Sequence, residues 1–382
     1  MVAVMSSAAC THPSSQTTTD ASGGALPDAS VSALPDANVS ATCATLTSAP
    51  GRADAVAFAA APREYAALLT IAMPDANGLL GRNHTWGQMV SARFQEGAGL
   101  GVRIAVATSQ EQAASATLNA IEVGLATVDP ATGELVFSPP PGISLPSVTP
   151  TDVASAAAFF LGDACLGLLA AGRAPDAWGL GARVDAQIPN VRLALTWLVQ
   201  QRALLASGDA DAPNRLLFDA RAFAACGAFV ADTSSRAIAH AFLAQSGALQ
   251  RDDGVVLEHD GSDTNYQSFS VRNLYDTLTV EDISTCSENV PRLLAGAQWL
   301  TGRVRPDGSV DSSGNSRTCG GGESFLGEPK RVSIVGVFEA LIATGAVTEQ
   351  SNVVAAGTRA AAWYRASPST NPCSCDTGPC GP

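Results

Sequence analysis

Apolar residues recur at helical spacing along most of the chain beyond residue 50. Within 264–280, for example, Val271, Leu274, Tyr275 and Leu278 share one face of a helix at about 100° per residue. The same period predicts helices over residues 61–72, 84–96, 109–126, 151–173, 189–206, 214–230, 233–247, 264–280, 288–303, 330–345 and 350–366. Strand signals are few, so the chain is predicted to be all-α.

The links between these helices are alternately short and long, which favours antiparallel helical hairpins. The chain is too long for one four-helix bundle, and no fixed-period repeat indicates a solenoid. We therefore expect an incomplete (α/α) toroid, with the long loops 248–263 and 304–329 gathered at one end around a central cleft. Two short hairpins are predicted at Thr132-Gly133 and Asp307-Gly308.

The two ends of the chain differ in composition from its body. Residues 11 to about 50 are rich in Ser, Thr, Ala and Pro, a composition that suits a disordered tether. This divides the chain into a signal remnant and tether at 1–50, a helical domain at 51–367 and a Cys-rich tail at 368–382.

The composition of the chain limits the kinds of molecule that it is expected to bind. A chain of 382 residues with 46% hydrophobic content can bury a large core. Its formal net charge of −13 argues against nucleic acid, and an anionic substrate would need a local basic pocket. Lys330 is the only lysine, which we interpret as genome composition. No apolar stretch of about 18 residues free of charge is evident, and we expect a monomer.

Nine cysteines point to an oxidising compartment. Residues 7–10, Ser-Ala-Ala-Cys, resemble a bacterial lipoprotein signal, with Ser where Leu is typical and a short apolar segment before it. Either the true start lies upstream or Cys10 is incidental. The resemblance implies an exported protein, held at a membrane only by lipid on Cys10. Cys286 and Cys319 flank one predicted helix and are the first candidates for a disulfide.

The stretch 252–274 is a loop with titratable side chains that runs into a helix. Thr264 and Gln267 have capping-box spacing, which places Tyr266 in the first turn. A second, uncharged stripe consists of Tyr266, Ser270, Asn273 and Thr277. Such a stripe suits the wall of a polar cleft, although a half-exposed helix face would look the same.

Two short motifs resemble toroid polysaccharide lyases. Asp253-Gly254 followed by apolar residues, His259 and then Tyr266 at a helix start resembles a segment of hyaluronate and chondroitin lyases. Residues 83–86, Asn-His-Thr-Trp, resemble an Asn-His-x-x-Trp motif of alginate lyases, with the Trp one residue early. The resemblance implies β-elimination on a uronate-containing polysaccharide.

A β-elimination mechanism would give each candidate residue a specific role. Asn83 and His84 would hold the sugar carboxylate. His259 or a deprotonated Tyr266 would take the C5 proton, and Tyr266 would return one to the departing oxygen. A phenolate needs a nearby cation, for which the candidates are Arg272, Arg317 and Arg82. The residues expected to bind substrate are Trp86, Arg272, Asn273, Arg317, Glu258 and Asp263.

Other interpretations of these residues stay open. Asn83 is also a plausible N-cap, His84 a locally bonded first-turn residue and Trp86 a core residue. Carboxylates of the 258–263 loop, with Glu323 as the second group, would suit a glycoside hydrolase. The same loop oxygens could bind Ca²⁺, although we expect no other metal and no cofactor. A catalytically inert glycan-binding lipoprotein is the third hypothesis.

Overall fold

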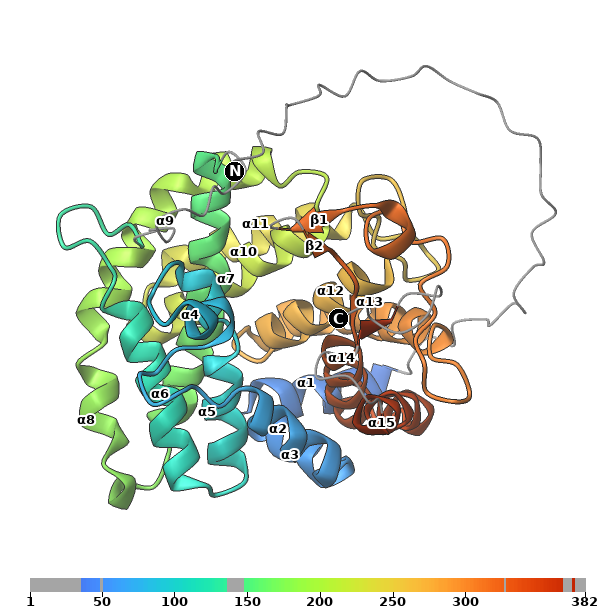
Figure 1. Ribbon diagram of the computed structural model, residues 1–382, viewed down its shortest axis with the longest axis horizontal. Helices are drawn as coiled ribbons and strands as arrows, with labels where there is room; N and C mark the ends of the chain where they lie inside the picture. The colour runs from blue at the N-terminus through green and yellow to red at the C-terminus, as the bar shows by residue number, and fades with distance from the viewer. Residues whose placement is uncertain (1–35, 49–50, 136–147, 326–327, 367–372, 375–382) are drawn as a thin grey trace, which may run out of the picture. The chain divides into compact units, whose positions relative to one another are not determined.

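The computed structural model describes residues 36–48, 51–135, 148–325, 328–366 and 373–374, all within the unit Ala33–Pro382 (Figure 1). These residues are all-α, as predicted. The helices are α1 (Asp36–Thr47), α2 (Arg52–Ala60), α3 (Pro62–Ile71), α4 (Gly81–Trp86), α5 (Ala98–Ala107), α6 (Glu111–Leu125), α7 (Pro150–Ala171), α8 (Leu180–Asp185), α9 (Ile188–Gly208), α10 (Pro213–Val230), α11 (Thr233–Gly247), α12 (Thr264–Leu278), α13 (Ile283–Gly302), α14 (Ile334–Val347) and α15 (Ser351–Ala366). Short 3₁₀ helices are η1 (Ala92–Gln95), η2 (Asp176–Trp178) and η3 (Cys319–Gly321).

Strands occupy very few of the described residues. β1 (Ser324–Phe325) pairs antiparallel with β2 (Glu328–Pro329), and β3 (Val332–Ser333) pairs antiparallel with β4 (Cys373–Ser374). Isolated bridges Val128–Leu135 and Val304–Val310 close the two predicted hairpins. β4 brings a piece of the predicted Cys-rich tail onto the helical body.

Helix α12 is the buried centre of the described fold. Nearly all of its residues are buried, and it packs against α10, α13 and α14. Figure 1 shows α12 beside α13 and α14, while α7 lies among α5, α9 and α10. Because α12 is enclosed on several sides, its polar residues must find partners inside the protein.

Helix α7 is the longest helix of the described residues and is mostly apolar, although it carries Asp152 and Asp163. By length and apolar composition it alone, among the described residues, could cross a membrane. Most of that apolar window is buried inside the structure, and α7 packs against α5 and α10. This pattern is that of the core helix of a globular body.

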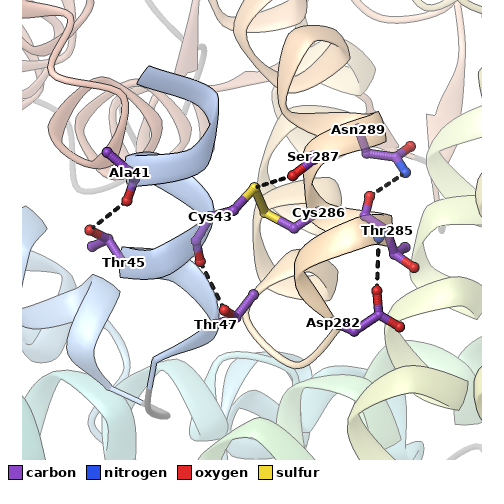
Figure 2. The surroundings of a disulfide bond; sticks show 9 residues. All are labelled: Ala41, Cys43, Thr45, Thr47, Asp282, Thr285, Cys286, Ser287 and Asn289. Carbon is purple, nitrogen blue, oxygen red and sulfur yellow. Dashed lines mark hydrogen bonds between the residues drawn. A yellow bond between two sulfur atoms is a disulfide. The ribbon is translucent and has the colours of Figure 1, made fainter. Parts of the chain in front are cut away.

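The predicted tether is helical over part of its length. Residues 36–47 form α1, which packs on α13, with Cys43 and Leu46 fully buried. A disulfide from Cys43 to Cys286 fixes this contact (Figure 2). Disorder is therefore the wrong prediction for α1, because its apolar residues are buried against α13. Residues 1–35, with Cys10, lie outside the described residues.

The predicted Cys286–Cys319 disulfide is also wrong. Cys286 lies in the first turn of α13 and pairs with Cys43, whereas Cys319 follows the far end of α13 and is disulfide-bonded elsewhere. A helix of 20 residues is about 30 Å long, so cysteines that flank it lie far apart. A second disulfide, Cys165–Cys226, joins α7 to α10.

Two other predicted helices have different boundaries. The predicted helix 84–96 is two elements, α4 and η1, because the chain turns at Gly87 with φ +66° and restarts at the Ser91 cap. The predicted helix 330–345 begins only at Ile334, because the chain is extended before it, with β2 at 328–329 and β3 at 332–333. The toroid arrangement of the helices stays a prediction.

Candidate functional site

The N-terminus of α12 is fixed by Asp263 and not by the predicted capping box. Asp263 Oδ1 accepts hydrogen bonds from the backbone N–H groups of Asn265 and Tyr266 at 3.0 and 3.2 Å. Its Oδ2 accepts from the backbone N–H groups of Arg317 and Thr318 at 3.1 and 2.7 Å. One carboxylate thus caps the helix and attaches the loop 303–318 to it. Asp263 has a structural role where the sequence suggested substrate binding.

The residues of the predicted capping box have other partners. Thr264 Oγ1 donates to the backbone O of Asp311 at 2.9 Å. Gln267 accepts from the backbone N–H of Val256 at 2.9 Å and donates to the backbone O of Gly254 at 3.0 Å. Both side chains therefore hold loops against α12, and Tyr266 nevertheless lies in the first turn, as predicted.

The phenol of Tyr266 is the centre of a group of charged side chains. Its hydroxyl donates to Glu323 Oε2 at 2.5 Å and accepts from Lys330 Nζ at 2.7 Å. Lys330 Nζ also donates to Glu323 Oε1 at 2.6 Å, and Arg317 Nη2 donates to the same oxygen at 2.7 Å. Arg317 also pairs with Glu258. We call Tyr266, Glu258, Arg317, Glu323 and Lys330 the Tyr266 cluster.

Local structure explains why these side chains meet. The β1–β2 hairpin pairs Ser324 with Pro329, so Glu323 and Lys330 lie opposite one another at its open end. The Lys330 backbone N–H donates to the Glu323 backbone O at 2.8 Å. The Arg317 guanidinium lies 4.4 Å from the centre of the Tyr266 ring, a cation–π distance. The loop that Asp263 holds therefore places Arg317 over the phenol.

Glu258 is carried by a tight turn in the loop before α12. A backbone bridge joins Glu258 to Gly261, and both residues between them have positive φ, +49° at His259 and +64° at Asp260. His and Asp tolerate this left-handed region better than most residues. The turn buries the Glu258 side chain against Arg317 and exposes His259, whose Nδ1 lies 2.8 Å from Asp211 Oδ2.

Burial and nearby charges shift the pKa values of the two glutamates of the cluster in opposite directions. Burial raises the pKa of Glu258 to about 8, against the opposing effect of Arg317. Burial also raises the pKa of Glu323, but hydrogen bonds from Lys330 and Tyr266 outweigh it and leave that pKa below its ordinary value. Burial and local charge thus favour the protonated form of Glu258 and the ionised form of Glu323.

The pKa values of the Tyr266 phenol and the Lys330 amine are shifted in opposite directions. Burial raises the pKa of Tyr266, with Arg317 opposing this and the hydrogen bond to Glu323 adding to it. Burial lowers the pKa of the Lys330 amine, and the charges of Arg93 and Arg317 lower it further against the effect of Glu323. The resting phenol is protonated, so the sequence hypothesis of a resting phenolate does not fit this geometry.

Further cations surround the cluster. Arg93 in η1 acts electrostatically on Lys330 and is influenced by Tyr266 and by Arg215 at the start of α10. Arg215 in turn is influenced by Arg317. The Arg93 guanidinium also lies 4.7 Å from the centre of the Phe159 ring. Arg215 itself pairs with Asp209 at 3.1 Å, so positive and negative groups alternate in this region.

The predicted residues on the body of α12 lie in a buried ionic network. Arg272 Nε is 3.1 Å from Glu339 Oε1, and its Nη2 is 3.7 Å from Glu96 Oε1. Burial opposes the charge of Arg272, but these and neighbouring carboxylates raise its pKa. Asn273 is fully buried and donates to the backbone O of Phe269 at 2.8 Å. Arg272 is thus a core cation, and not the cation beside Tyr266.

The predicted motif at 83–86 makes local contacts. Asn83 is fully buried; its amide donates to Ser91 O and Gln95 Oε1 at 2.9 and 3.1 Å and accepts from the Val90 backbone N–H at 2.9 Å. These bonds use the amide to hold the turn after α4. Asn83 is therefore a structural residue here and offers no atom to a substrate carboxylate.

His84 and Trp86 complete this local arrangement. His84 is exposed, and its Nδ1 lies 3.0 Å from Asp75 Oδ2. The Trp86 ring contacts Phe94 edge-on at 5.6 Å. The structure thus brings together Tyr266, Glu258, Asp263 and Arg317, while the partners of Asn83, His84 and Trp86 lie within residues 75–95.

Metal binding has one candidate among the described residues. His240, Glu281 and Asp282 place ligand atoms within 4.8 Å of one another. The Arg236 guanidinium already lies 3.6 Å from Glu281 Oε2, and His240 Nε2 lies 2.9 Å from the same oxygen. In the loop predicted for Ca²⁺, Glu258 Oε1 pairs with Arg317 and Asp263 accepts from backbone N–H groups, so these two carboxylates have other partners.

Sequence reasoning missed Lys330 and Arg93. Lys330 carried a signal, since it is the only lysine in the chain, but composition gave no reason to place it beside Tyr266. Comparison with known proteins adds no further guide: no protein-family profile, curated protein or solved structure matches the chain.

Proposed function

We propose that this chain is an exported carbohydrate-active enzyme that cleaves a uronate-containing polysaccharide by β-elimination at the Tyr266 cluster. The observation that carries the proposal is the Tyr266 phenol in contact with Lys330 and beneath the Arg317 guanidinium, in an otherwise acidic chain. A guanidinium at this position suits a substrate that carries carboxylates, because the chain as a whole repels anions.

The chemistry needs a group that neutralises the uronate carboxylate and an acid for the leaving oxygen. Arginines are suited to the first role because a guanidinium binds a carboxylate through two parallel hydrogen bonds. Arg317 and Arg93 are the candidates, in place of Asn83 and His84. Arg317 would exchange one of its carboxylate partners, Glu258 or Glu323, for that of the substrate. Tyr266 is suited to the second role, because burial keeps its hydroxyl protonated and that hydroxyl already donates a hydrogen bond, to Glu323.

A glycoside hydrolase is the second candidate, and one observation favours it. Glu258 and Glu323 are linked through Arg317, and their environments move their pKa values in opposite directions. A protonated and an ionised carboxyl at one site are the acid and the base or nucleophile of glycoside hydrolysis. In that reaction Glu258 would be the acid.

One experiment separates the candidates. The protein is incubated with a panel of uronate polymers, and both ultraviolet absorbance and new reducing ends are measured. β-Elimination creates an unsaturated product that absorbs, so absorbance that rises with reducing ends supports the lyase. Reducing ends without absorbance identify the hydrolase. Binding with neither product identifies an inert glycan-binding protein, the third hypothesis.

The role of the phenol is tested by Tyr266→Phe. The variant keeps the ring under Arg317 and loses only the hydroxyl, so we expect an unchanged fold and a loss of about 10²–10⁴-fold in kcat. Arg251→Gln, at an exposed site that pairs with Asp253, is the matched control. Full turnover by Tyr266→Phe would remove the phenol from the mechanism.

The wider setting is part of the same proposal. The two disulfides are compatible with an exported protein. Attachment to a membrane through lipid at Cys10, which lies outside the described residues, and a monomeric state are proposed from the sequence. Intact mass of the protein purified from its native membrane fraction would reveal such a lipid.

A further inference from the structure

Lys330 is held rigidly at the open end of the β1–β2 hairpin. Its backbone N–H donates to Glu323 O at 2.8 Å, and its backbone O accepts from the Cys319 N–H at 2.9 Å. Cys319 is itself disulfide-bonded, and β3, which begins two residues later, pairs with β4. The main chain is thus fixed on both sides, so that the amine is directed at Tyr266.

The presence of a lysine, and not an arginine, at position 330 indicates a role that a guanidinium could not fill. Every other Lys or Arg position in the chain is an arginine, including Arg317 in the same cluster and Arg272 in the buried network. A guanidinium would supply a positive charge and more donors, but it stays protonated at any physiological pH. An amine differs because it can release its proton. Burial and the charges of Arg93 and Arg317 favour that release, and together they outweigh the opposing ion pair with Glu323 at 2.6 Å.

Resting on the β-elimination proposed above, we propose that Lys330 is the base that takes the substrate proton and Tyr266 the acid that protonates the leaving oxygen. The neutral amine accepts the C5 proton, and the electron pair of that C–H bond forms the C4=C5 double bond. The C4–O bond breaks, and the Tyr266 proton goes to the departing oxygen.

The 2.7 Å hydrogen bond between the two groups then restores the site. After elimination Lys330 is an ammonium and Tyr266 a phenolate, so one proton transfer along this bond returns both to their starting states. Glu323 accepts hydrogen bonds from both groups, at 2.6 and 2.5 Å, and holds them together. The cycle consumes and releases no net proton. It differs from a mechanism with a resting phenolate because two groups, Lys330 and Tyr266, share the roles of base and acid.

The first test needs no substrate. Reductive methylation with ¹³C-formaldehyde labels the one lysine and the chain terminus, and NMR follows each signal with pH. Arg63→Lys, at an exposed position of α3, adds an ordinary amine as an internal reference. We expect Lys330 to titrate below that reference in the folded protein and with it in urea. The charged and titratable groups facing Lys330 are Glu323, Tyr266, Arg317 and Arg93.

The second test uses the polymer that the ultraviolet assay identifies. Lys330→Arg keeps the charge and removes the exchangeable amine, so we expect kcat to fall about 10²–10⁴-fold. A merely structural cation would be replaced without that loss. In the unsubstituted protein the acidic limb of the kcat profile should follow the titration of the amine seen by NMR.

The outcomes are distinct. Lys330 titrating with the Arg63→Lys amine, or Lys330→Arg retaining turnover, would overturn the base assignment and leave β-elimination standing. A low titration with no unsaturated product from any uronate polymer would overturn the proposed function, and the base role with it. Three results together would establish the assignment. Lys330 would titrate below the Arg63→Lys amine, the acidic limb of the kcat profile would follow that titration, and Lys330→Arg would lose turnover.

Discussion

Glu258→Gln tests the electrostatics of the site through stability. The Glu258 side chain is almost fully buried, and its pKa is raised from 4.5 to about 8. A raised carboxyl pKa means that ionisation is harder in the folded state. The free energy of unfolding therefore falls as the pH rises from the ordinary pKa to the folded one. At about 1.36 kcal/mol per pKa unit, this one group costs about 3 kcal/mol at pH 7 and about 5 kcal/mol above pH 8.

Glutamine imitates the neutral acid, so the variant removes this pH dependence. We would measure urea unfolding of both proteins at pH 5, 7 and 9, where the difference between them isolates Glu258 from other carboxyls. At pH 5 the two free energies of unfolding should nearly coincide. At pH 9 the variant should be the more stable by about 5 kcal/mol, the full pKa shift converted at about 1.36 kcal/mol per unit.

Glu323→Gln is the matched control with the opposite sign. The pKa of Glu323 is lowered, so its stabilisation is present above its ordinary pKa and is lost as the pH falls through the folded value. Its substitution should destabilise at pH 7 and cease to matter in acid. A Glu258→Gln variant destabilised equally at pH 5 and pH 9 would refute the reasoning, because it would mean that the ion pair with Arg317 outweighs burial.

Three further predictions concern the scaffold. Replacing Cys43 and Cys286 together by Ser should lower the free energy of unfolding by up to about 5 kcal/mol for a sequence separation of 243, with α1 losing hydrogen-exchange protection first; unchanged protection in α1 would contradict this. Asp263→Ala should cost about 1–3 kcal/mol in urea unfolding, because four backbone N–H groups lose their acceptor. His84→Ala should change stability by less than about 0.5 kcal/mol and leave kcat unchanged, since the side chain is exposed; a large fall in kcat would return His84 to the site.

The all-α class was predictable because a period of 3.6 is a local property of the sequence. The misses have local causes too. Helix α5 has little polar contrast, with every residue from Ala98 to Ala105 buried, so no face stood out. Helix α1 looked like a linker by composition, and its burial depends on α13 and a disulfide from far along the chain. A linear pattern does not contain such contacts.

Part of the site was predictable for the same reason. Tyr266, Glu258 and Arg317 were recognised as chemistry-bearing residues of two long loops and a helix start, and the structure places them together. Their roles were harder to assign. Arg272 was a candidate cation for the phenol, yet on a helix the next turn faces a different neighbour, and Arg272 meets Glu339 of α14.

The uncharged polar stripe of α12 does not have the exposure that its sequence pattern predicted. A helix face without charge was expected to line a cleft, but Tyr266, Ser270, Asn273 and Thr277 are all buried. Thr277 donates to the backbone of its own helix, whereas Ser270 Oγ and Asn273 Oδ1 have no hydrogen-bond partner among the described residues. Such oxygens cost about 1–3 kcal/mol each.

Buried polar groups without a hydrogen-bond partner are uncommon in folded proteins, so each of them needs a structural or functional explanation. Along α12 the polar groups continue without a break from the Tyr266 cluster at its N-terminus to the ionic network around Arg272 and Asp276. The N-terminus of α12 thus lies in the Tyr266 cluster, and its body lies in the buried ionic network. Because the helix is enclosed on several sides, Tyr266 in its first turn meets the Lys330 amine and the Glu323 carboxylate, which the β1–β2 hairpin supplies.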